Sequence, residues 1–407
     1  MINMGVLFAY SRIHDIEGDR VPLSSDEAAH YLLEPGDLLF ARQSLVLSGA
    51  GKCSIFLGAE EPTTFESHLM RARISPDKGD PLFYYYYYQS PMGRQAVISI
   101  AEQVAAAGIR GSDLSMLNVP WPPLKEQQAI ACILGALDDK IELNRRMNQT
   151  LEAMAQAIFK SWFVDFDPVR AKAAGQQPAG LAPHIAELFP DSFEDSEIGE
   201  VPRGWSIYSL PALIDINPPR HIPRGSVAPY LEMASMPTRS HAPDSWIDRE
   251  VGSGMKFING DTLLARITPC LENGKTAYVD FLKDGEVGWG STEYIVLRPR
   301  EPIPAVFAYL LARDDNFRTF AIQRMTGSSG RQRVPSDSLA DYQLAAPAID
   351  SLVFKIFGRV VNPLFERARS AMGQSRTLAA LRDALLPKLI SGELRVADAE
   401  RIVGRCT

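Results

Sequence analysis

The sequence predicts a mixed α+β fold: two α/β modules in a pseudo-twofold repeat, separated by two long antiparallel helices that pack like a coiled coil. Two observations predict it. A series of motifs recurs at an offset of about 224 residues, and each copy is followed by a long stretch with helical spacing of apolar residues. With 407 residues, 46% of them hydrophobic, the chain is long enough to bury separate cores.

The repeat consists of short motifs that recur in the same order. The run Gly36–Arg42, GDLLFAR, returns as Gly260–Arg266, GDTLLAR. Three further pairs follow: Gly51-Lys52 with Gly274-Lys275, Ser112-Asp113-Leu114 with Ser336-Asp337-Ser338-Leu339, and Pro122-Pro123 with Ala346-Pro347. A single repeat at so long a period indicates two copies of one design rather than a solenoid of short units.

These landmarks divide the chain into a first module over 1–123, a helix over 124–164, a linker over 165–200, a second module over 201–347, a second helix over 348–395 and a tail over 396–407. The segment 165–200 is rich in Pro, Ala, Gly and acidic residues, so we expect a solvated linker or a loosely packed strap. By the repeat offset, Met1 aligns near residue 225. We therefore expect an N-terminally truncated first module that lacks a counterpart of Val201–Arg224, as a truncated gene product or because the start codon is assigned too late.

Each module mixes short apolar runs with turn signals. Leu38–Ala41 and Leu263–Ala265 are predicted to be buried strands entered through a Gly-Asp turn, and Tyr294–Leu297 a further strand. Ala305–Leu311 and Pro81–Tyr88 are expected to lead into helices. The latter holds five adjacent tyrosines, which cannot all face one side of a helix. We expect most of these rings in the core and one or two exposed.

The two helices are predicted from apolar residues spaced three and four apart. Their seams comprise Leu134, Leu137, Ile141, Asn144, Asn148, Leu151, Ile158 and Trp162 in the first, and Val353, Phe357, Val360, Leu364, Leu378, Leu381 and Leu385 in the second. The two asparagines are expected to fix the register of the pair, because few alignments satisfy a buried amide. Pro363 should kink or break the second helix, because proline lacks the amide proton. Neither helix alone can remove its row of apolar residues from water, so antiparallel packing of the two is expected.

Charge alone does not point to nucleic acid. The net charge of −7 divides into −5 over 1–123, −6 over 124–200, zero over 201–347 and +4 over 348–407. Four cysteines stand apart from one another without a CxxC pair, and six scattered histidines show no metal-ligand spacing. We expect reduced thiols in a cytoplasmic protein without a metal site. No apolar run is long enough for a membrane span.

Three motifs match catalytic sites only in part. Gly274-Lys275-Thr276 lacks the upstream glycine of a phosphate-binding loop, and Asn217-Pro218-Pro219 is followed by Arg220 where an adenine methyltransferase has an aromatic ring. Glu293, Asp284 and Lys275 lack a diagnostic nuclease spacing. We therefore expect no catalytic residue and no enzyme activity in this chain.

The segments that follow each module resemble those of a known family. Pro122–Ile130, Leu137–Asn148 and Ala157–Pro168 closely resemble the central conserved region of type I restriction–modification specificity subunits. Leu381–Leu394, LRDALLPKLISGEL, is similar to the carboxy-terminal signature of that family. The resemblance covers essentially the whole chain, and its motifs are long and specific.

This resemblance implies a division of labour. Two target-recognition domains would each read one half of a split site in double-stranded DNA, with the paired helices as a spacer between them. Methylation subunits, two copies of them, would dock along the helices, and restriction subunits would join the complex. S-adenosylmethionine, ATP and magnesium would belong to those partners and not to this chain.

Contacts with DNA are nominated from hydrogen-bond donors near the repeated turns and in the loop Thr326–Arg333, which combines arginines, a glutamine, hydroxyls and glycines. The candidates are Arg42, Lys52 and Arg110 in the first module, and Arg220, Arg266, Lys275, Ser328, Ser329, Arg331, Gln332 and Arg333 in the second. The truncation and the acidic charge of the first module favour the second as the competent reader. An alternative is a degenerate or non-DNA assembly scaffold that uses only the helical hairpin.

Overall fold

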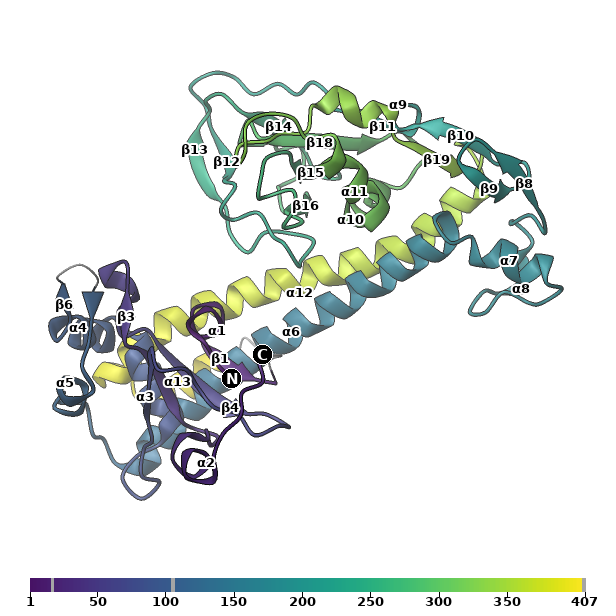
Figure 1. Ribbon diagram of the computed structural model, residues 1–407. Helices are drawn as coiled ribbons and strands as arrows, with labels where there is room; N and C mark the ends of the chain where they lie inside the picture. The colour runs from purple at the N-terminus through teal and green to yellow at the C-terminus, as the bar shows by residue number, and fades with distance from the viewer. Residues whose placement is uncertain (16–17, 104–106, 405–407) are drawn as a thin grey trace. The chain divides into compact units, whose positions relative to one another are not determined.

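The structure is a computed structural model that describes residues 1–15, 18–103 and 107–404. The chain forms two compact units, drawn in Figure 1. Unit 1 comprises Met1–Glu142 with Thr377–Thr407, and unit 2 comprises Leu143–Arg376. Each unit therefore contains one α/β module and a part of each of the two long helices.

Unit 1 is built on a four-stranded sheet in the order β1-β4-β2-β5. Its strands are β1 (Arg12–His14), β2 (Leu38–Ala41), β4 (Cys53–Gly58) and β5 (Leu69–Ala72). Only β1 runs parallel to its neighbour β4; the other pairs are antiparallel. The remaining elements of the module are α1 (Met4–Ala9), α2 (Ser25–Tyr31), β3 (Gln43–Ser44), η1 (Leu47–Gly49), α3 (Pro81–Gln89), α4 (Pro91–Ser99), β6 (Glu102–Gln103), β7 (Ala107–Gly108) and α5 (Gly111–Ser115).

The tyrosine run lies on α3, which begins at Asp80 as N-cap with Pro81 in the first turn. All five rings, Tyr84–Tyr88, are buried, so the prediction that one or two are exposed is wrong. The helix can bury every side because it is enclosed in the same core cluster as Phe40 of the sheet and Leu134 of the first long helix. A stacking surface for bases is therefore not available on α3.

Unit 2 contains two four-stranded sheets, in the orders β11-β18-β15-β16 and β13-β12-β17-β14. The strands of the first are β11 (Ile214–Ile216), β15 (Thr262–Ala265), β16 (Thr276–Tyr278) and β18 (Tyr294–Pro299), and those of the second are β12 (Val227–Leu231), β13 (Ile247–Glu250), β14 (Met255–Phe257) and β17 (Gly288–Gly290). A strand pair of β10 (Ser206–Ser209) and β19 (Gln343–Ala346) lies beside α9 (Leu210–Leu213), α10 (Val306–Arg313), α11 (Asp315–Gln323) and η2 (Ser336–Asp341).

The central three strands of the two modules have the same register. Leu38 pairs with Ala72 and Ile55 in unit 1, and Thr262 pairs with Leu297 and Tyr278 in unit 2. The strands β4-β2-β5 therefore correspond to β16-β15-β18. The internal repeat predicted from the sequence is confirmed at the level of individual strand pairs.

The repeated Gly-Asp step has a structural role in both modules. Gly36 and Gly260 have φ angles of 96° and 88°, which favour glycine, and turn the chain into the central strand. The carboxylate of the buried Asp37 accepts hydrogen bonds from the Glu34 amide at 2.8 Å and from Arg73 Nε at 2.7 Å. Asp261 does the same with the Ile258 amide at 2.8 Å and Arg298 Nη1 at 3.2 Å. The motif is thus a strand-entry turn rather than a binding loop.

Of the two alternatives predicted for the segment 165–200, the solvated linker is wrong, because a few of its residues pack against the core of unit 2. It contains α7 (Asp167–Ala173), α8 (Pro183–Ala186), β8 (Phe193–Ser196) and β9 (Gly199–Pro202). Phe166, Val169 and Phe189 are buried in the main core cluster of unit 2. The overall composition concealed these few apolar anchors, which are enough to fold the segment against the core.

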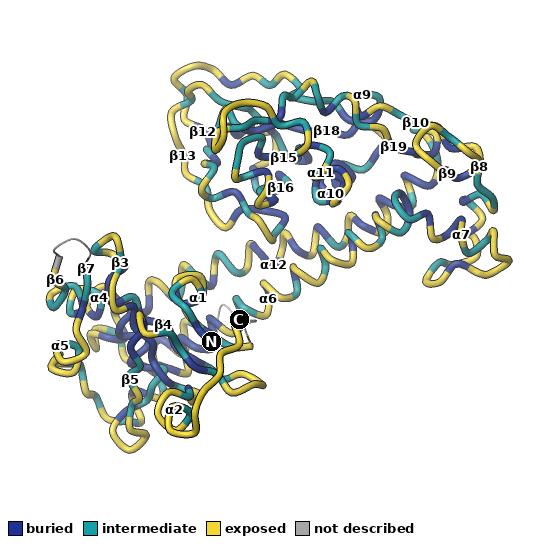
Figure 2. The backbone as a smooth tube through the Cα atoms, in the orientation of Figure 1, coloured by how far each residue is buried: buried dark blue, intermediate teal, exposed yellow. Residues whose placement is uncertain are grey.

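The two long helices are α6 (Leu124–Phe163) and α12 (Leu352–Ser391), followed by α13 (Val396–Val403). Unit 1 joins the first part of α6 to the last part of α12, and unit 2 joins the complementary parts, so the helices pair in antiparallel sense within each unit. Buried and exposed positions alternate along both in Figure 2. Most predicted seam residues are buried or half-buried: Leu134, Leu137, Ile141, Asn144, Asn148, Leu151, Ile158, Trp162, Val353, Phe357, Leu364, Leu378, Leu381 and Leu385.

One predicted seam position on the second helix is wrong, and of the two effects predicted for Pro363 the break does not occur. Val360 is exposed, and Val361 and Phe365 take the buried positions instead. Pro363 lies within α12 without ending it. Proline removes one helical hydrogen bond and costs about 3 kcal/mol, but burial of the flanking Val361 and Phe365 side chains offsets a cost of that size.

Candidate nucleic-acid interface

Arg42 and Arg266 occupy the same place in the two modules, directly after the central strands β2 and β15. The Arg42 amide donates to the His68 carbonyl at 2.8 Å, and its carbonyl accepts from the Ile109 amide at 2.9 Å. Arg266 is held in the same way by Glu293, at 3.0 Å, and by Val334, at 2.9 Å. Both backbones are therefore fixed on two sides, and both side chains leave the sheet at the equivalent position.

A short hairpin lies next to each of these arginines. Thr326 and Arg333 exchange two backbone hydrogen bonds of 2.9 Å, and Arg333 also pairs with Ile267, the residue after Arg266. In unit 1, Glu102 of β6 pairs with Gly108 of β7, which pairs with Gln43, the residue after Arg42. The structure thus places a hairpin beside the strand-exit arginine in both modules.

The two hairpins differ in chemistry. In unit 2 the hairpin exposes Ser328, Ser329 and Arg331, while Gln332 is half-buried and its carbonyl accepts the Thr268 amide at 3.0 Å. In unit 1, Arg110 follows the hairpin and its Nη2 forms an exposed ion pair with Glu102 Oε2 at 2.7 Å. Hydrogen-bond donors for base edges and phosphates are therefore concentrated on the hairpin of the second module.

Arg333 is already paired within its own module. Its Nε donates to both carboxylate oxygens of Glu293, at 2.8 and 2.9 Å, and its Nη2 lies 2.7 Å from Glu293 Oε1. This hydrogen-bonded carboxylate raises the pKa of the Arg333 guanidinium. Within the described ranges, by contrast, the side chains of Arg266 and Arg331 form no ion pair and donate no hydrogen bond; it is the carbonyl of Arg331 that accepts from Arg333 Nη1, at 3.1 Å. Arg266 and Arg331 are the cations of this site whose charge is left for a ligand.

Both nominated lysines bind main-chain carbonyls of their own module. Lys52 Nζ donates to the Phe8 carbonyl at 2.8 Å and lies 5.0 Å from the centroid of the Phe8 ring. Burial, followed by the nearby Arg94 charge, lowers the pKa of Lys52. Lys275 Nζ donates to the Met233 carbonyl at 2.6 Å. The repeated Gly-Lys step therefore serves to hold a neighbouring segment in each module.

Arg220 is bound at the strand-entry turn rather than at the hairpin. Its Nη2 lies 3.1 Å from Oδ1 of Asp261, which is fully buried. Asn217, three residues earlier, adopts a φ of 53°. Its amide donates to the Val296 carbonyl at 2.7 Å, and its Oδ1 accepts from the Val296 amide at 2.9 Å. Asn217 thus fastens this segment to β18, and Arg220 fastens it to the turn that enters β15.

One exposed arginine was missed by the sequence analysis. Arg249 lies on β13, whose four residues are all exposed, and its Cζ is 5.0 Å from the Tyr230 ring centroid and 5.9 Å from that of Trp289. The rings hold its guanidinium in place by cation–π contact. The internal repeat could not reveal it, because Arg249 lies in the second sheet of unit 2, outside the strands that the two modules share. Its alternation with Asp248 and Glu250 gave no distinctive charge pattern.

Over residues 1–15, 18–103 and 107–404, no cluster of three or more His, Cys, Asp or Glu side chains is arranged to hold a metal ion. No helix in the same part of the chain has both the length and the apolar character needed to cross a membrane. Cys53, Cys132 and Cys270 are free thiols, and Cys406 lies outside the described residues.

Comparison with known proteins gives a consistent result. Residues 16–153 match the family model described as the type I restriction modification DNA specificity domain. The MjaIX specificity subunit of Methanocaldococcus jannaschii is 24% identical over 88% of this chain and 79% of its own length. The HindI specificity subunit of Haemophilus influenzae is 26% identical over 69% of this chain and 70% of its own.

A solved structure shares the fold. The type I restriction–modification S subunit of M. genitalium superimposes with a TM-score of 0.50 and 16% identity, covering 93% of this chain and 88% of that one. The family match covers most of the first module and most of α6. In its repeat, its paired helices and its sequence, the chain is similar to type I restriction–modification DNA specificity subunits.

Proposed function

We propose that the chain recognises a split site in double-stranded DNA, with one module on each half, and positions methylation and restriction subunits of a type I system. The observation that carries this proposal is the equivalent placement of Arg42 and Arg266, each after a buried central strand and beside a hairpin. Two modules of one design are what two half-sites require. Similarity to type I specificity subunits supports the same function.

The second module has the better-equipped site. Arg266 and Arg331 carry charges that no described acidic side chain neutralises, and Ser328 and Ser329 add hydroxyls on an exposed turn. Arginine guanidinium donors match the O6 and N7 acceptors of guanine, and each such pair discriminates by about 1–3 kcal/mol. In the first module, Glu102 and Arg110 compensate one another, so Arg42 stands as its principal cation.

The two long helices are proposed to set the gap between the half-sites. A helix advances about 1.5 Å per residue and B-DNA about 3.4 Å per base pair, so a spacer of fixed length selects a fixed gap. Two methylation subunits would dock along the helices. S-adenosylmethionine, ATP and magnesium would be bound by the partner subunits in the cytoplasm, and this chain would contribute recognition without catalysis.

The test is to map methylated DNA in cells that carry this chain together with its methylation partners. We expect a split motif. Arg266→Ala and Arg331→Ala should relax one half and lower affinity for it about 10-fold or more, and Arg42→Ala should relax the other half. Arg300→Ala is the matched control, because Arg300 lies past the far end of β18 in an exposed ion pair with Asp215.

Two outcomes would overturn the proposal. A continuous methylated motif would exclude reading by two separated modules. An unchanged motif in all three variants would remove the strand-exit arginines and the hairpin from recognition. Stable assembly with the partners but no sequence-specific DNA binding would instead support the scaffold, the alternative that the acidic net charge of −7 favours.

A further inference from the structure

One edge of the first module's sheet is uncovered where the second module has a strand. In unit 2 the outer edge of β18 pairs with β11, through Leu297 with Ile216 and Pro299 with Ile214. In unit 1 the equivalent strand β5 is the last of its sheet, and no strand among the described residues pairs with its outer side. The shared register makes residues 72–74 the counterparts of residues 297–299.

In the second module a single segment, Ser206–Ile216, packs against three neighbouring elements: β19, η2 and β18. Its first part, β10, pairs with β19, from Ser206 with Ala346 to Ser209 with Gln343. Its apolar turn, α9, buries Leu210 and Leu213 completely beside η2. Its last part is β11 on the edge of β18. The Leu210 amide bonds to the Tyr342 carbonyl at 2.9 Å, and the Leu213 carbonyl to the Arg300 amide at 2.8 Å.

In the first module the counterparts of β18, η2 and β19 line one cavity of about 1330 Å³. The edge of β5 contributes Ala72, Arg73 and Ile74. The helix α5, which stands where η2 stands in unit 2, contributes Leu114 and its neighbours. The stretch 117–121, just before the Pro122-Pro123 marker as β19 is before Pro347, contributes Leu117, Asn118, Val119 and Trp121. The cavity therefore coincides with the place that Ser206–Ile216 occupies in the other copy.

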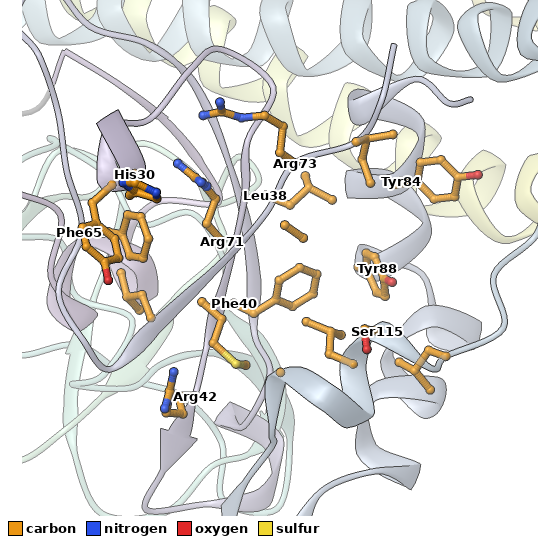
Figure 3. Close-up of a pocket in the computed structure, with 18 of the residues that line it drawn as sticks. His30, Leu38, Phe40, Arg42, Phe65, Arg71, Arg73, Tyr84, Tyr88 and Ser115 are labelled. Carbon is orange, nitrogen blue, oxygen red and sulfur yellow. The ribbon is translucent and has the colours of Figure 1, made fainter. Parts of the chain in front are cut away.

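The lining of this cavity suits a polypeptide. Leu38, Phe40 and the rings of Tyr84 and Tyr88 form apolar walls beside the strand edge (Figure 3). Trp121, 75% exposed, also lines it and is the kind of large apolar side chain that a partner normally covers. The volume exceeds the 300–1,000 Å³ or so of typical small-molecule sites.

Three arginines line the cavity: Arg42 is the strand-exit arginine proposed above for DNA, and the other two are bound within the module. Arg71 Nη1 donates to the Leu32 carbonyl at 2.9 Å. Arg73 is bound to Asp37 by Nε and Nη2, both at 2.7 Å, and is also paired with Glu34. Arg71 and Arg73 are thus held within the module, whereas no described strand pairs with the outer backbone of β5.

We propose that this cavity is an acceptor for a polypeptide segment with the strand–apolar turn–strand pattern of Ser206–Ile216. The segment would add one strand to β5 and another to residues 118–121, and it would place two apolar side chains against Leu114 and Leu117. This is recognition by strand addition, in which the backbone supplies affinity and alternate side-chain pockets supply selectivity. Ser206–Ile216 itself is bound in its own module, so the proposed occupant is a segment of the same pattern from another polypeptide chain.

The test uses the full chain and a synthetic peptide with the sequence of residues 203–219 of this same chain. Because Met1 also lines the cavity, a second arm fuses that sequence ahead of Met1 through a short Gly/Ser linker, which raises its effective concentration to the millimolar range. Binding of the fluorescent peptide is followed by anisotropy. Hydrogen–deuterium exchange with mass spectrometry reports residues 69–74 and 117–121 in both arms.

We expect saturable binding and at least 10-fold slower amide exchange in both reporter segments. A peptide carrying Leu210→Asp and Leu213→Asp should bind the unmodified chain at least 10-fold more weakly. Leu114→Arg should weaken binding equally, whereas Met116→Arg, on an 81% exposed side chain that does not line the cavity, should not. Unchanged exchange in both arms, or binding indifferent to both the peptide and the cavity substitutions, would overturn the proposal.

Discussion

Arg382 Nη1 lies 2.6 Å from Asp138 Oδ1 and joins the last part of α12 to the first part of α6 within unit 1. The other oxygen of Asp138 accepts the hydroxyl of Tyr86, on α3, at 2.7 Å. Asp138 is only 7% exposed, so a single carboxylate connects three helices in a region of low solvent access. It hydrogen-bonds at both oxygens, which offsets the cost of burying its charge.

Removing this carboxylate should destabilise unit 1. We expect Asp138→Ala to lower the free energy of unfolding by about 3 kcal/mol, because it leaves the Arg382 charge and the Tyr86 hydroxyl without their partner. Asp383→Ala is the control: Asp383 pairs with the same arginine at 2.7 Å but is 64% exposed, so we expect at most about 0.5 kcal/mol. Urea unfolding of both variants measures the difference. Equal losses would show that burial of Asp138 is unimportant.

Asn144 should stabilise the helix pair in unit 2. Its buried Nδ2 lies 3.0 Å from Gln374 Oε1 and 3.2 Å from Ser375 Oγ. We expect Asn144→Ala to cost about 1–2 kcal/mol, because it leaves the acceptors on α12 unsatisfied. Gln149→Ala on the exposed side of α6 should stay within about 0.5 kcal/mol of the parent. A neutral Asn144→Ala in thermal or urea unfolding would contradict this role.

Substitutions at Lys275 and Arg266 should have different effects, the first on stability and the second on DNA binding. Lys275→Met removes the hydrogen bond to the Met233 carbonyl, and we expect a loss of about 1 kcal/mol in unfolding free energy with an unchanged salt dependence of DNA binding. Arg266→Ala should leave stability nearly unchanged and, if the arginine meets a phosphate, reduce the slope of log affinity against log salt by about 0.9. Binding titrations over a range of salt concentrations decide it, and a reduced slope in Lys275→Met would reverse the assignment.

Asp314 should make the stability of unit 2 depend on pH. Burial raises the pKa of this N-cap carboxyl above its ordinary value of 3.8. The folded state therefore binds the proton more readily than the unfolded state. The resulting stabilisation is present below pH 3.8 and is lost as pH rises through the higher folded pKa.

Asp314→Asn retains an oxygen that can accept the amides of Asn316 and Phe317 but does not ionise. We expect the variant to gain stability relative to the parent as pH rises from about 4 to 7. Urea unfolding at several pH values measures this difference, with Asp315→Asn, at an 87% exposed neighbour, as the control. A difference that stays constant with pH would show that burial does not perturb this carboxyl.

Much of the fold could be predicted from the sequence because its strongest signals are local. The Gly-Asp turn, the strands at Leu38–Ala41 and Thr262–Ala265 and the two long helices follow from residue type and spacing. Comparing the two copies gave more, since it placed Arg42 and Arg266 at equivalent positions before any coordinates. The wrong predictions of a solvated linker at 165–200, of a buried Val360 and of exposed tyrosines share one cause. In each, burial against residues distant in sequence outweighed the local preference.

Residue order was enough to predict two related modules, two long helices with apolar faces, and arginines at matched positions. Repeats and apolar spacing are local properties of the chain. Which cationic side chains stay unpaired, and so can bind a ligand, depends on the folded structure. Arg333 is paired with Glu293, 40 residues away, and Lys275 with a carbonyl 42 residues away, whereas Arg266 is not paired in the described chain. Such pairings depend on which backbones meet in the folded core, and no local spacing encodes that. The uncovered edge of β5 became a cavity for the same reason: its partner strand in the other copy comes from a segment distant in sequence.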